Sequence, residues 1–388
     1  MYKFRTVQKL EDFDWKRFIR DCSQVRLVNR FRAKRIVAYG CGELGQMFKE
    51  FSEHEKILID CFVDKNWRSV SKRDYWKNTV IQSIESLRAF DPDDTTIVIC
   101  VANFSLEGIL QDLKDLGFRN VITFYDFAKV IEKSYPIDNG WYFDITKVKI
   151  SRVKNILNNL ADKNSIAHYL TFLAWRIHRC ELQFPEFPID TSSRFLIDEV
   201  YRNRELEHRL IDVGSHHGEA VRKIFNKVGT QLKKVWAFEA DPVNFQTLGT
   251  SIKQFLPPNI EISLFQRVIW KESVSIKFAN GFNYASRIQE TGTPVNAITL
   301  DSLKLNPTII KIHTEGSELD VLKGAMKTIE IHRPCIMMTV YHNPSGLFET
   351  LEFVFENLTQ YVLYFRNHSY HGTGATVYAI PRQARTGN

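Results

Sequence analysis

A chain of 388 residues that is 44% hydrophobic and 25% charged has an ordinary globular composition, and its length suits two domain cores. Its net charge of +7 comes from Lys and Arg spread along the chain, without the basic cluster and interleaved aromatics typical of nucleic-acid binding, so that class is disfavoured. The mild positive charge suits an anionic substrate such as a nucleotide sugar or an acidic glycan. Because the sequence has no apolar leader and no run of 18 apolar residues, we expect a soluble, cytoplasmic protein without a membrane span.

Strands alternate with helices in the first third of the chain. Apolar strands are predicted at 35–40, 57–63, 96–101 and 120–124, and helices at 46–52 and 106–116. This alternation favours a parallel sheet with covering helices. We therefore predict an α/β, Rossmann-like domain over residues 1–135.

The first strand runs into a glycine-rich turn with glycines at 40, 42 and 45, and Asp64 ends the next strand. This spacing matches the dinucleotide-binding fingerprint. The segment also resembles the small Rossmann-like domains attached to sugar-modifying enzymes, which implies a sugar nucleotide or no ligand at all. Three interpretations stay open: a second nucleotide site formed by Gly40, Gly42, Gly45 and Asp64, a scaffold without ligand, and NAD-dependent redox chemistry.

The middle of the chain changes pattern. Apolar residues recur at helical spacing from Ile150 to Leu160 and again from Ile166 to Ile177, which predicts two helices. Pro185 then interrupts the pattern. We expect a helical linker over residues 136–205.

The last part, residues 206–388, again alternates strands and helices. The final two strands are too close in sequence for a helix between them, so we expect an antiparallel hairpin at one edge of the sheet. Strands are predicted at 210–213, 234–238, 261–265, 308–312, 335–341, 361–365 and 375–380.

A second glycine-rich turn follows the first strand of this domain. Gly214 and Gly218 let the backbone approach a ligand closely, and Asp212 is placed to act on the cationic amino-acid end of a cofactor. Glu239 ends the next strand, where a carboxylate accepts hydrogen bonds from ribose hydroxyls. The alternatives are a tight turn without ligand and, for Asp241, a helix cap. The pattern suits a dinucleotide or a sulfonium cofactor equally.

Polar residues also follow the fourth and fifth strands. His313, Glu315 and Glu318 come after the fourth strand, and Tyr341 and His342 after the fifth. Ligands of parallel α/β sheets bind outside the carboxyl ends of the strands, so we expect these side chains at the same cleft.

Several of these motifs together resemble the FkbM family of S-adenosylmethionine-dependent methyltransferases, over roughly residues 195–382. They are Ile211-Asp-Val-Gly with Gly218-Glu, Phe238-Glu-Ala-Asp-Pro, Ile298-Thr-Leu-Asp-Ser-Leu, Lys311-Ile-His-Thr-Glu-Gly-Ser-Glu, Tyr341-His, Tyr364-Phe-Arg-Asn-His and Thr376-Val-Tyr-Ala-Ile-Pro. The resemblance implies a class I methyltransferase-type seven-stranded sheet, and O-methylation of a sugar hydroxyl on a glycan, a glycolipid or a nucleotide-linked sugar.

At one position the chain departs from the family, which usually has an aspartate where this sequence has His313. An imidazole can take up a hydroxyl proton, so His313 is a candidate general base. The alternatives are a residue that only shapes the pocket, or an impaired enzyme. Glu315 and His313 are metal-ligating residue types, but a pair does not define a site, and we predict no metal.

The sequence thus predicts a carbohydrate-modifying O-methyltransferase that uses S-adenosyl-L-methionine and a glycan or small-molecule acceptor. The alternatives are an NAD-dependent sugar oxidoreductase or epimerase, and a non-catalytic nucleotide-binding protein with a decayed site. The acceptor and the oligomeric state stay open. The predicted catalytic residues are His313, Glu315, Tyr341 and His342, and the predicted cofactor-binding residues are Asp212, Gly214, His216, Gly218, Glu239, Ala240 and Val268.

Six single cysteines without close pairs argue against zinc binding and suggest reduced, mostly buried thiols. They are Cys22, Cys41, Cys61, Cys100, Cys180 and Cys335.

Overall fold

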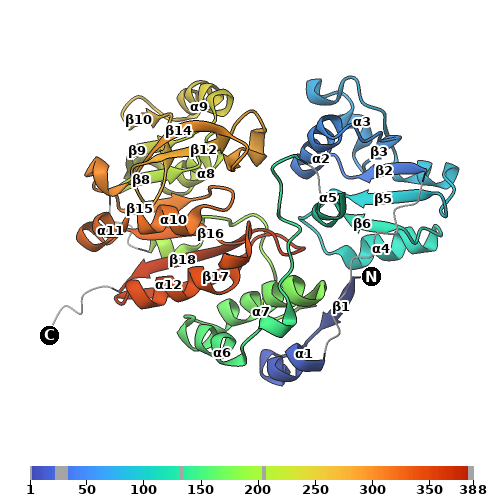
Figure 1. Ribbon diagram of the computed structural model, residues 1–388, viewed down its shortest axis with the longest axis horizontal. Helices are drawn as coiled ribbons and strands as arrows, with labels where there is room; N and C mark the ends of the chain where they lie inside the picture. Colours follow the sequence, from blue (N-terminus) through green and yellow to red (C-terminus); the bar gives the residue numbers. More distant parts are fainter. Residues whose placement is uncertain (1, 22–33, 132–133, 203–206, 383–388) are drawn as a thin grey trace.

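The structure is a computed structural model that describes residues 2–21, 34–131, 134–202 and 207–382. Figure 1 shows an N-terminal sheet on the right, a C-terminal sheet on the left, and helices below and between them. The predicted domain boundary at residue 205 and the predicted free Cys22 lie outside the described residues. None of the other five cysteines forms a disulfide among the described residues, and all but Cys335 are buried. No helix in the described ranges is long and apolar enough to cross a bilayer.

The N-terminal domain contains a five-stranded parallel sheet in the order β4-β3-β2-β5-β6, as the alternating pattern predicted. Residues of β2, β3 and β5 are mostly buried because helices pack on both faces. The strands are β2 (Arg35–Tyr39), β3 (Cys61–Val63), β4 (Ile81–Gln82), β5 (Thr95–Ile99) and β6 (Val121–Thr123). The helices are α2 (Glu43–His54), α3 (Trp67–Val70), α4 (Leu106–Asp115) and α5 (Phe124–Ile131).

The two predicted linker helices are present as α6 (Ile150–Asn159) and α7 (Lys163–His178). Helix α7 covers the edge strand of the C-terminal sheet, β17 (Tyr361–Asn367). Ser165 Oγ and His168 Nδ1 accept the backbone N–H groups of Phe365 and Asn367 at 3.1 and 3.0 Å. The helix therefore satisfies donors that an open sheet edge would expose.

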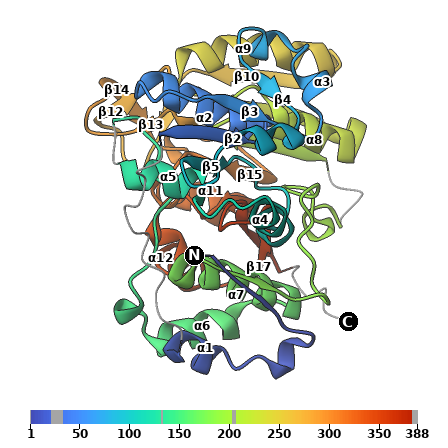
Figure 2. The ribbon, with the colours of Figure 1, turned by 90° about the vertical axis from the view of Figure 1, so that its right-hand side faces the viewer.

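The start of the chain joins this helical layer. Strand β1 (Lys3–Thr6) pairs in parallel with β7 (Cys180–Gln183), the strand that follows α7 in the chain. Helix α1 (Trp15–Asp21) follows β1 in the chain. Figure 2 shows α1 beside α6 and α7 at the base of the molecule. The sequence did not predict this pairing.

The C-terminal sheet has seven strands in the order β10-β9-β8-β15-β16-β18-β17, and its last two strands form the antiparallel hairpin that was predicted. The remaining strands are β8 (His208–Val213), β9 (Leu232–Phe238), β10 (Glu261–Phe265), β15 (Ile309–Ile312), β16 (Cys335–Thr339) and β18 (Ala375–Pro381). The helices are α8 (Glu219–Val228), α9 (Pro242–Phe255), α10 (Glu318–Lys323), α11 (Met326–His332) and α12 (Glu349–Asn357).

A small four-stranded sheet lies between β10 and β15 in sequence and was not predicted. It consists of β11 (Val268–Ile269), β12 (Ser275–Ala279), β13 (Arg287–Ile288) and β14 (Thr293–Ile298), in the order β11-β14-β12-β13. The loop between β12 and β13 reaches the N-terminal domain. There Phe282 packs edge-on against His54 and Tyr135, with ring centroids 5.5 and 5.3 Å apart.

A buried ion pair connects the N-terminal sheet domain to α7. Arg179, at the end of α7, places a guanidinium nitrogen 2.8 Å from the carboxylate of Asp126 on α5, and both side chains are only 2% exposed. Tyr2 donates a second hydrogen bond to the same carboxylate. The pair fixes the α5 end of the N-terminal sheet against the helical layer.

We predict that Asp126→Asn lowers the free energy of unfolding by about 3–5 kcal/mol, because it leaves a buried guanidinium without its counter-charge. Urea denaturation of the full chain measures the loss. Asp138→Asn is the matched control, since Asp138 pairs with Lys129 at 3.5 Å on the surface and should change stability by about 1 kcal/mol or less. Equal effects of the two substitutions would contradict the assignment.

Candidate active site

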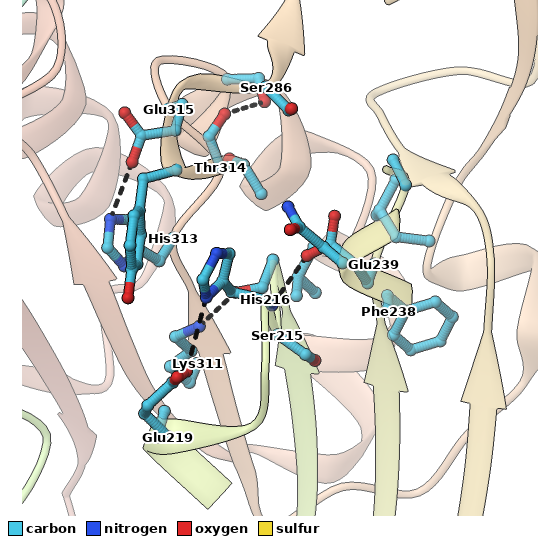
Figure 3. A pocket seen from close by; sticks show the side chains of 18 of the residues that line it. Ser215, His216, Glu219, Phe238, Glu239, Ser286, Lys311, His313, Thr314 and Glu315 are labelled. Carbon is cyan, nitrogen blue, oxygen red and sulfur yellow. Dashed lines mark hydrogen bonds and ion pairs between the residues drawn. The ribbon is translucent and has the colours of Figure 1, made fainter. Parts of the chain in front are cut away.

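A cavity of about 290 Å³ opens at the carboxyl ends of β8, β9 and β15. Figure 3 shows the glycine turn after β8 at its centre, with Glu239 on one side and His313 and Glu315 on the other. Five of the predicted cofactor residues line the cavity, as do two of the predicted catalytic residues: Gly214, His216, Glu239, Ala240, Val268, His313 and Glu315. Four others, Asp212, Gly218, Tyr341 and His342, are not among the residues that line it.

The turn after β8 requires glycine for a steric reason. Gly214 has a φ of +72°, and a Cβ at this position would lie 1.8 Å from the backbone oxygen of His313. The strand ends of β8 and β15 therefore approach as closely as their backbones allow. Gly218 has a φ of +90° and caps α8, so it shapes the turn from outside the cavity.

Asp212, which was predicted to bind the cofactor, is not among the residues that line the cavity. Its side chain is fully buried, and one carboxylate oxygen lies 2.7 Å from Nζ of Lys311, which is also buried. The same ammonium donates to the backbone oxygen of Gly214 at 2.7 Å. Asp212 therefore neutralises the lysine that holds the glycine turn to β15, because a buried ammonium requires a counter-charge.

Glu239 lies at the end of β9 with its carboxylate at the cavity wall (Figure 3). It accepts the backbone N–H of His216 at 2.7 Å and that of Asp241 at 2.9 Å. Burial raises the pKa of Glu239, and these hydrogen bonds oppose the rise. Asp241 itself caps α9 by accepting the N–H groups of Val243 and Asn244, so the helix-cap alternative for Asp241 is correct.

His216 is held in place by the loop between β12 and β13. Its ring stacks on Tyr284 with centroids 4.0 Å apart, and its Nε2 lies 2.8 Å from the side-chain oxygen of Asn283. The amide group of Asn283 donates to Glu50 of α2 at 3.2 Å. The N-terminal domain thus helps to position this wall, and its Glu43 also lines the cavity.

Four ionisable groups stand in a row at the His313 end of the cavity, and two of them, His313 and Glu315, line it. Nε2 of His313 and Nε2 of His342 each lie 3.2 Å from one oxygen of Glu315, and Nδ1 of His342 lies 2.6 Å from Glu318. Glu315 has a φ of +50°, a left-handed conformation that is strained for a non-glycine residue and is typical of functional sites. Figure 3 shows its side chain turned toward His313.

These groups shift one another's pKa. Burial and the guanidinium of Arg194 lower the pKa of His313 to about 3, so its imidazole is neutral and weakly basic. Burial opposes a charge on His342, but the carboxylates of Glu315 and Glu318 raise its pKa well above the ordinary value. Burial also opposes ionisation of Glu315, whereas His342 and His313 hold its pKa well below the usual range.

Arg194 was missed by sequence reasoning. Its guanidinium lies 3.2 Å from Nδ1 of His313 and 3.2 Å from the hydroxyl of Tyr341, and it lines the cavity. It stands in an irregular segment between Pro188 and β8, 119 residues before His313, so no local pattern connects the two. Tyr341 is buried behind this guanidinium and contacts His313 at 3.4 Å.

The glycine motif of the N-terminal domain is packed against itself. A Cβ on Gly45 would lie 2.3 Å from the backbone oxygen of Gly40, whereas Gly42 faces open space. Asp64 accepts the backbone N–H of Cys41 at 2.8 Å. These contacts give Gly45 and Asp64 a structural function in the turn, and none of the four predicted residues lines the cavity described above.

Comparison with known proteins gives one family. Residues 212–371 match the family described as methyltransferase FkbM domain. No curated protein matches the chain in sequence.

Among solved structures, FkbM methyltransferase from Methylobacillus flagellatus KT has a TM-score of 0.60 at 18% identity and covers 89% of this chain and 90% of its own. This likeness shows a shared fold that extends beyond the matched domain. Precorrin-6y C5,15-methyltransferase from Geobacter metallireducens GS-15 has a TM-score of 0.31 at 13% identity and covers 50% of this chain and 86% of its own. A putative caffeoyl-CoA O-methyltransferase from Staphylococcus aureus has a TM-score of 0.33 at 10% identity, with coverages of 50% and 85%.

We predict that Gly214→Ala abolishes ligand binding at this cavity and lowers the free energy of unfolding, because the new Cβ collides with His313. Calorimetric titration with S-adenosylhomocysteine and urea denaturation measure the two effects.

Gly281→Ala is the matched control, since Gly281 also has a positive φ, +79°, but a Cβ there meets no atom within 4 Å. It should cost only the conformational strain of about 1–2 kcal/mol. If the two variants were equally stable and bound the ligand equally well, the steric explanation would be wrong.

Proposed function

We propose that this chain, whose residues 212–371 form a methyltransferase FkbM domain, transfers a methyl group from S-adenosylmethionine to a hydroxyl of a sugar-containing acceptor. The observation that carries the proposal is that one cavity contains two chemically different ends. At one end lie the glycine turn and Glu239, and at the other lie His313 and Glu315. A transferase needs its donor and acceptor in one such space.

The cofactor end fits S-adenosylmethionine in shape and in chemistry. The turn from Gly214 to His216 lines the cavity, so its backbone can contact a ligand there. Glu239 is a buried carboxylate at the cavity wall, suited to accept hydrogen bonds from both ribose hydroxyls. Ala240, Val268 and Phe238 add apolar surface next to it, as an adenine ring requires.

When bound, S-adenosylmethionine supplies an electrophilic methyl group on a positively charged sulfur. The chain's contribution is to hold an acceptor oxygen in line with that methyl group, and such positioning accounts for much of the rate in bimolecular transfers. His216 and the Gly214 turn fix the donor side, while His313 and Glu315 face the acceptor side.

The end of the cavity at His313 and Glu315 is suited to bind the hydroxyl group of an acceptor. Glu315 is ionised and can accept a hydrogen bond from a hydroxyl, and Arg194 can donate one to its oxygen. The low pKa of His313 weakens it as a base on its own. A sugar as the carrier of the hydroxyl is inferred from the family resemblance.

We predict that the full chain binds S-adenosylhomocysteine and that Glu239→Gln weakens this binding roughly 10- to 100-fold. Hydrogen bonds to a charged group contribute about 1.5–3 kcal/mol, and each 1.4 kcal/mol is about a tenfold change in affinity. Isothermal titration calorimetry with S-adenosylhomocysteine, and separately with NAD, provides the measurement.

Glu261→Gln is the control, since Glu261 is exposed at the other end of the sheet and pairs with Lys234 at 2.8 Å. It should leave the affinity unchanged. Binding of NAD in place of S-adenosylhomocysteine would favour the oxidoreductase alternative and overturn the proposal.

A further inference from the structure

His313, Glu315 and His342 form a cluster of three potential metal ligands at the acceptor end. Strands β15 and β16 pair in register from Ile309 to Ile312, so the residues that follow each strand meet at the same edge of the sheet. One ligand atom from each of the three side chains lies within 4.8 Å of the others.

The distances within the cluster suit one shared ion. Nε2 of His313 and Nε2 of His342 are each 3.2 Å from the same oxygen of Glu315. Ligand atoms bound to one ion at roughly 2.0–2.2 Å lie about 3–3.5 Å from one another. Two of the three distances thus already have the spacing of neighbouring ligands, and the ligand atoms of the two histidines lie within 4.8 Å of each other.

An independent observation is the partner of His342 on its other side. Nδ1 of His342 lies 2.6 Å from the carboxylate of Glu318. The same carboxylate accepts the backbone N–H groups of Thr314 and Gly316, each at 3.1 Å. Histidine ligands almost always donate their second ring N–H to a carboxylate or carbonyl, which fixes the ring and the tautomer. The ion pair with Glu318 fixes Nδ1 of His342, which is buried, and leaves Nε2 on the side of Glu315.

We propose that His313, Glu315 and His342 bind a divalent transition-metal ion, and that Glu318 orients His342 for it. Two imidazoles and one carboxylate are a ligand set for ions such as Zn²⁺, Fe²⁺ or Mn²⁺, whereas Mg²⁺ and Ca²⁺ prefer oxygen ligands alone. His313 and Glu315 line the cavity, so the coordination positions left open face the acceptor.

The charges of the cluster are consistent with this assignment. Glu315 and Glu318 carry two negative charges, which the imidazolium of His342 and the guanidinium of Arg194 offset. Once His342 has lost its proton, one negative charge remains, and a divalent ion changes it into a single positive charge, which favours an alkoxide at the acceptor position. The proton on Nε2 of His342 leaves to solvent when the ion binds.

The catalytic consequence rests on the proposed function. An acceptor hydroxyl bound to the ion is more acidic than the free hydroxyl and loses its proton to water. Its oxygen then attacks the methyl carbon as the carbon–sulfur bond breaks, and the electron pair of that bond stays on sulfur. The ion thus supplies the activation that His313 alone does not provide.

The test is metal binding by the full chain after dialysis against EDTA. We expect one Zn²⁺ per chain by calorimetry, and one Co²⁺ with visible absorption bands that report its coordination. His313→Ala and Glu315→Gln should weaken binding at least tenfold. Glu318→Gln, which acts through His342 and through the loop that carries Glu315, should weaken it by roughly 10- to 100-fold. Circular dichroism confirms that each variant is folded, and His313→Ala changes a partly exposed side chain.

His217→Ala is the matched control, because His216, His217 and Glu219 form a second group with ligand atoms close together. It should leave the affinity unchanged. The proposal is overturned if no ion binds stoichiometrically, if His313→Ala and Glu315→Gln bind it normally, or if only His217→Ala loses it. S-adenosylhomocysteine titration of the same samples separates this result from the proposed function, since its binding needs Glu239 and not the ion.

Discussion

The active-site geometry depends on one buried ammonium group. Nζ of Lys311 lies between the carboxylate of Asp212 and the backbone oxygen of Gly214, 2.7 Å from each. It thereby joins the ends of β8 and β15 at the point where the missing side chain of Gly214 lets the two backbones meet. Because a buried charge is tolerated only when it is paired, Asp212 and Lys311 must stay together. The cofactor end and the acceptor end of the cavity begin on either side of this junction.

The N-terminal domain contributes to the same cavity. Phe282 is inserted among its aromatic side chains, and Glu50 binds Asn283, which contacts His216. The loop that covers the donor side is therefore held from both domains. The structural likeness to the Methylobacillus flagellatus protein covers 89% of this chain, whereas the family match begins at Asp212. The glycine motif after β2 packs tightly on itself, and its residue Glu43 points to the shared cavity.

Much of the fold was predictable, because long apolar strands, paired glycine turns and a final hairpin have distinct patterns in sequence. The small sheet from Val268 to Ile298 was not predicted, since two of its strands have only two residues each and carry no measurable alternation. At the site, the residues that follow strand ends were predictable by position. The contacts of Arg194 and the pairing of Asp212 with Lys311 were not, because they depend on side-chain directions and on segments far apart in the chain.

The central claim is that the cofactor binds at the carboxyl ends of β8 and β9, and not at the glycine turn of the N-terminal domain. Photolabelling tests it directly: the full chain is irradiated with S-adenosyl-[methyl-³H]methionine, digested, and the labelled peptides are identified by mass spectrometry. The account predicts label in peptides that contain Gly214 to Glu219, or Glu239 and the residues next to it. Label confined to the peptides around Gly40 and Asp64 would contradict it.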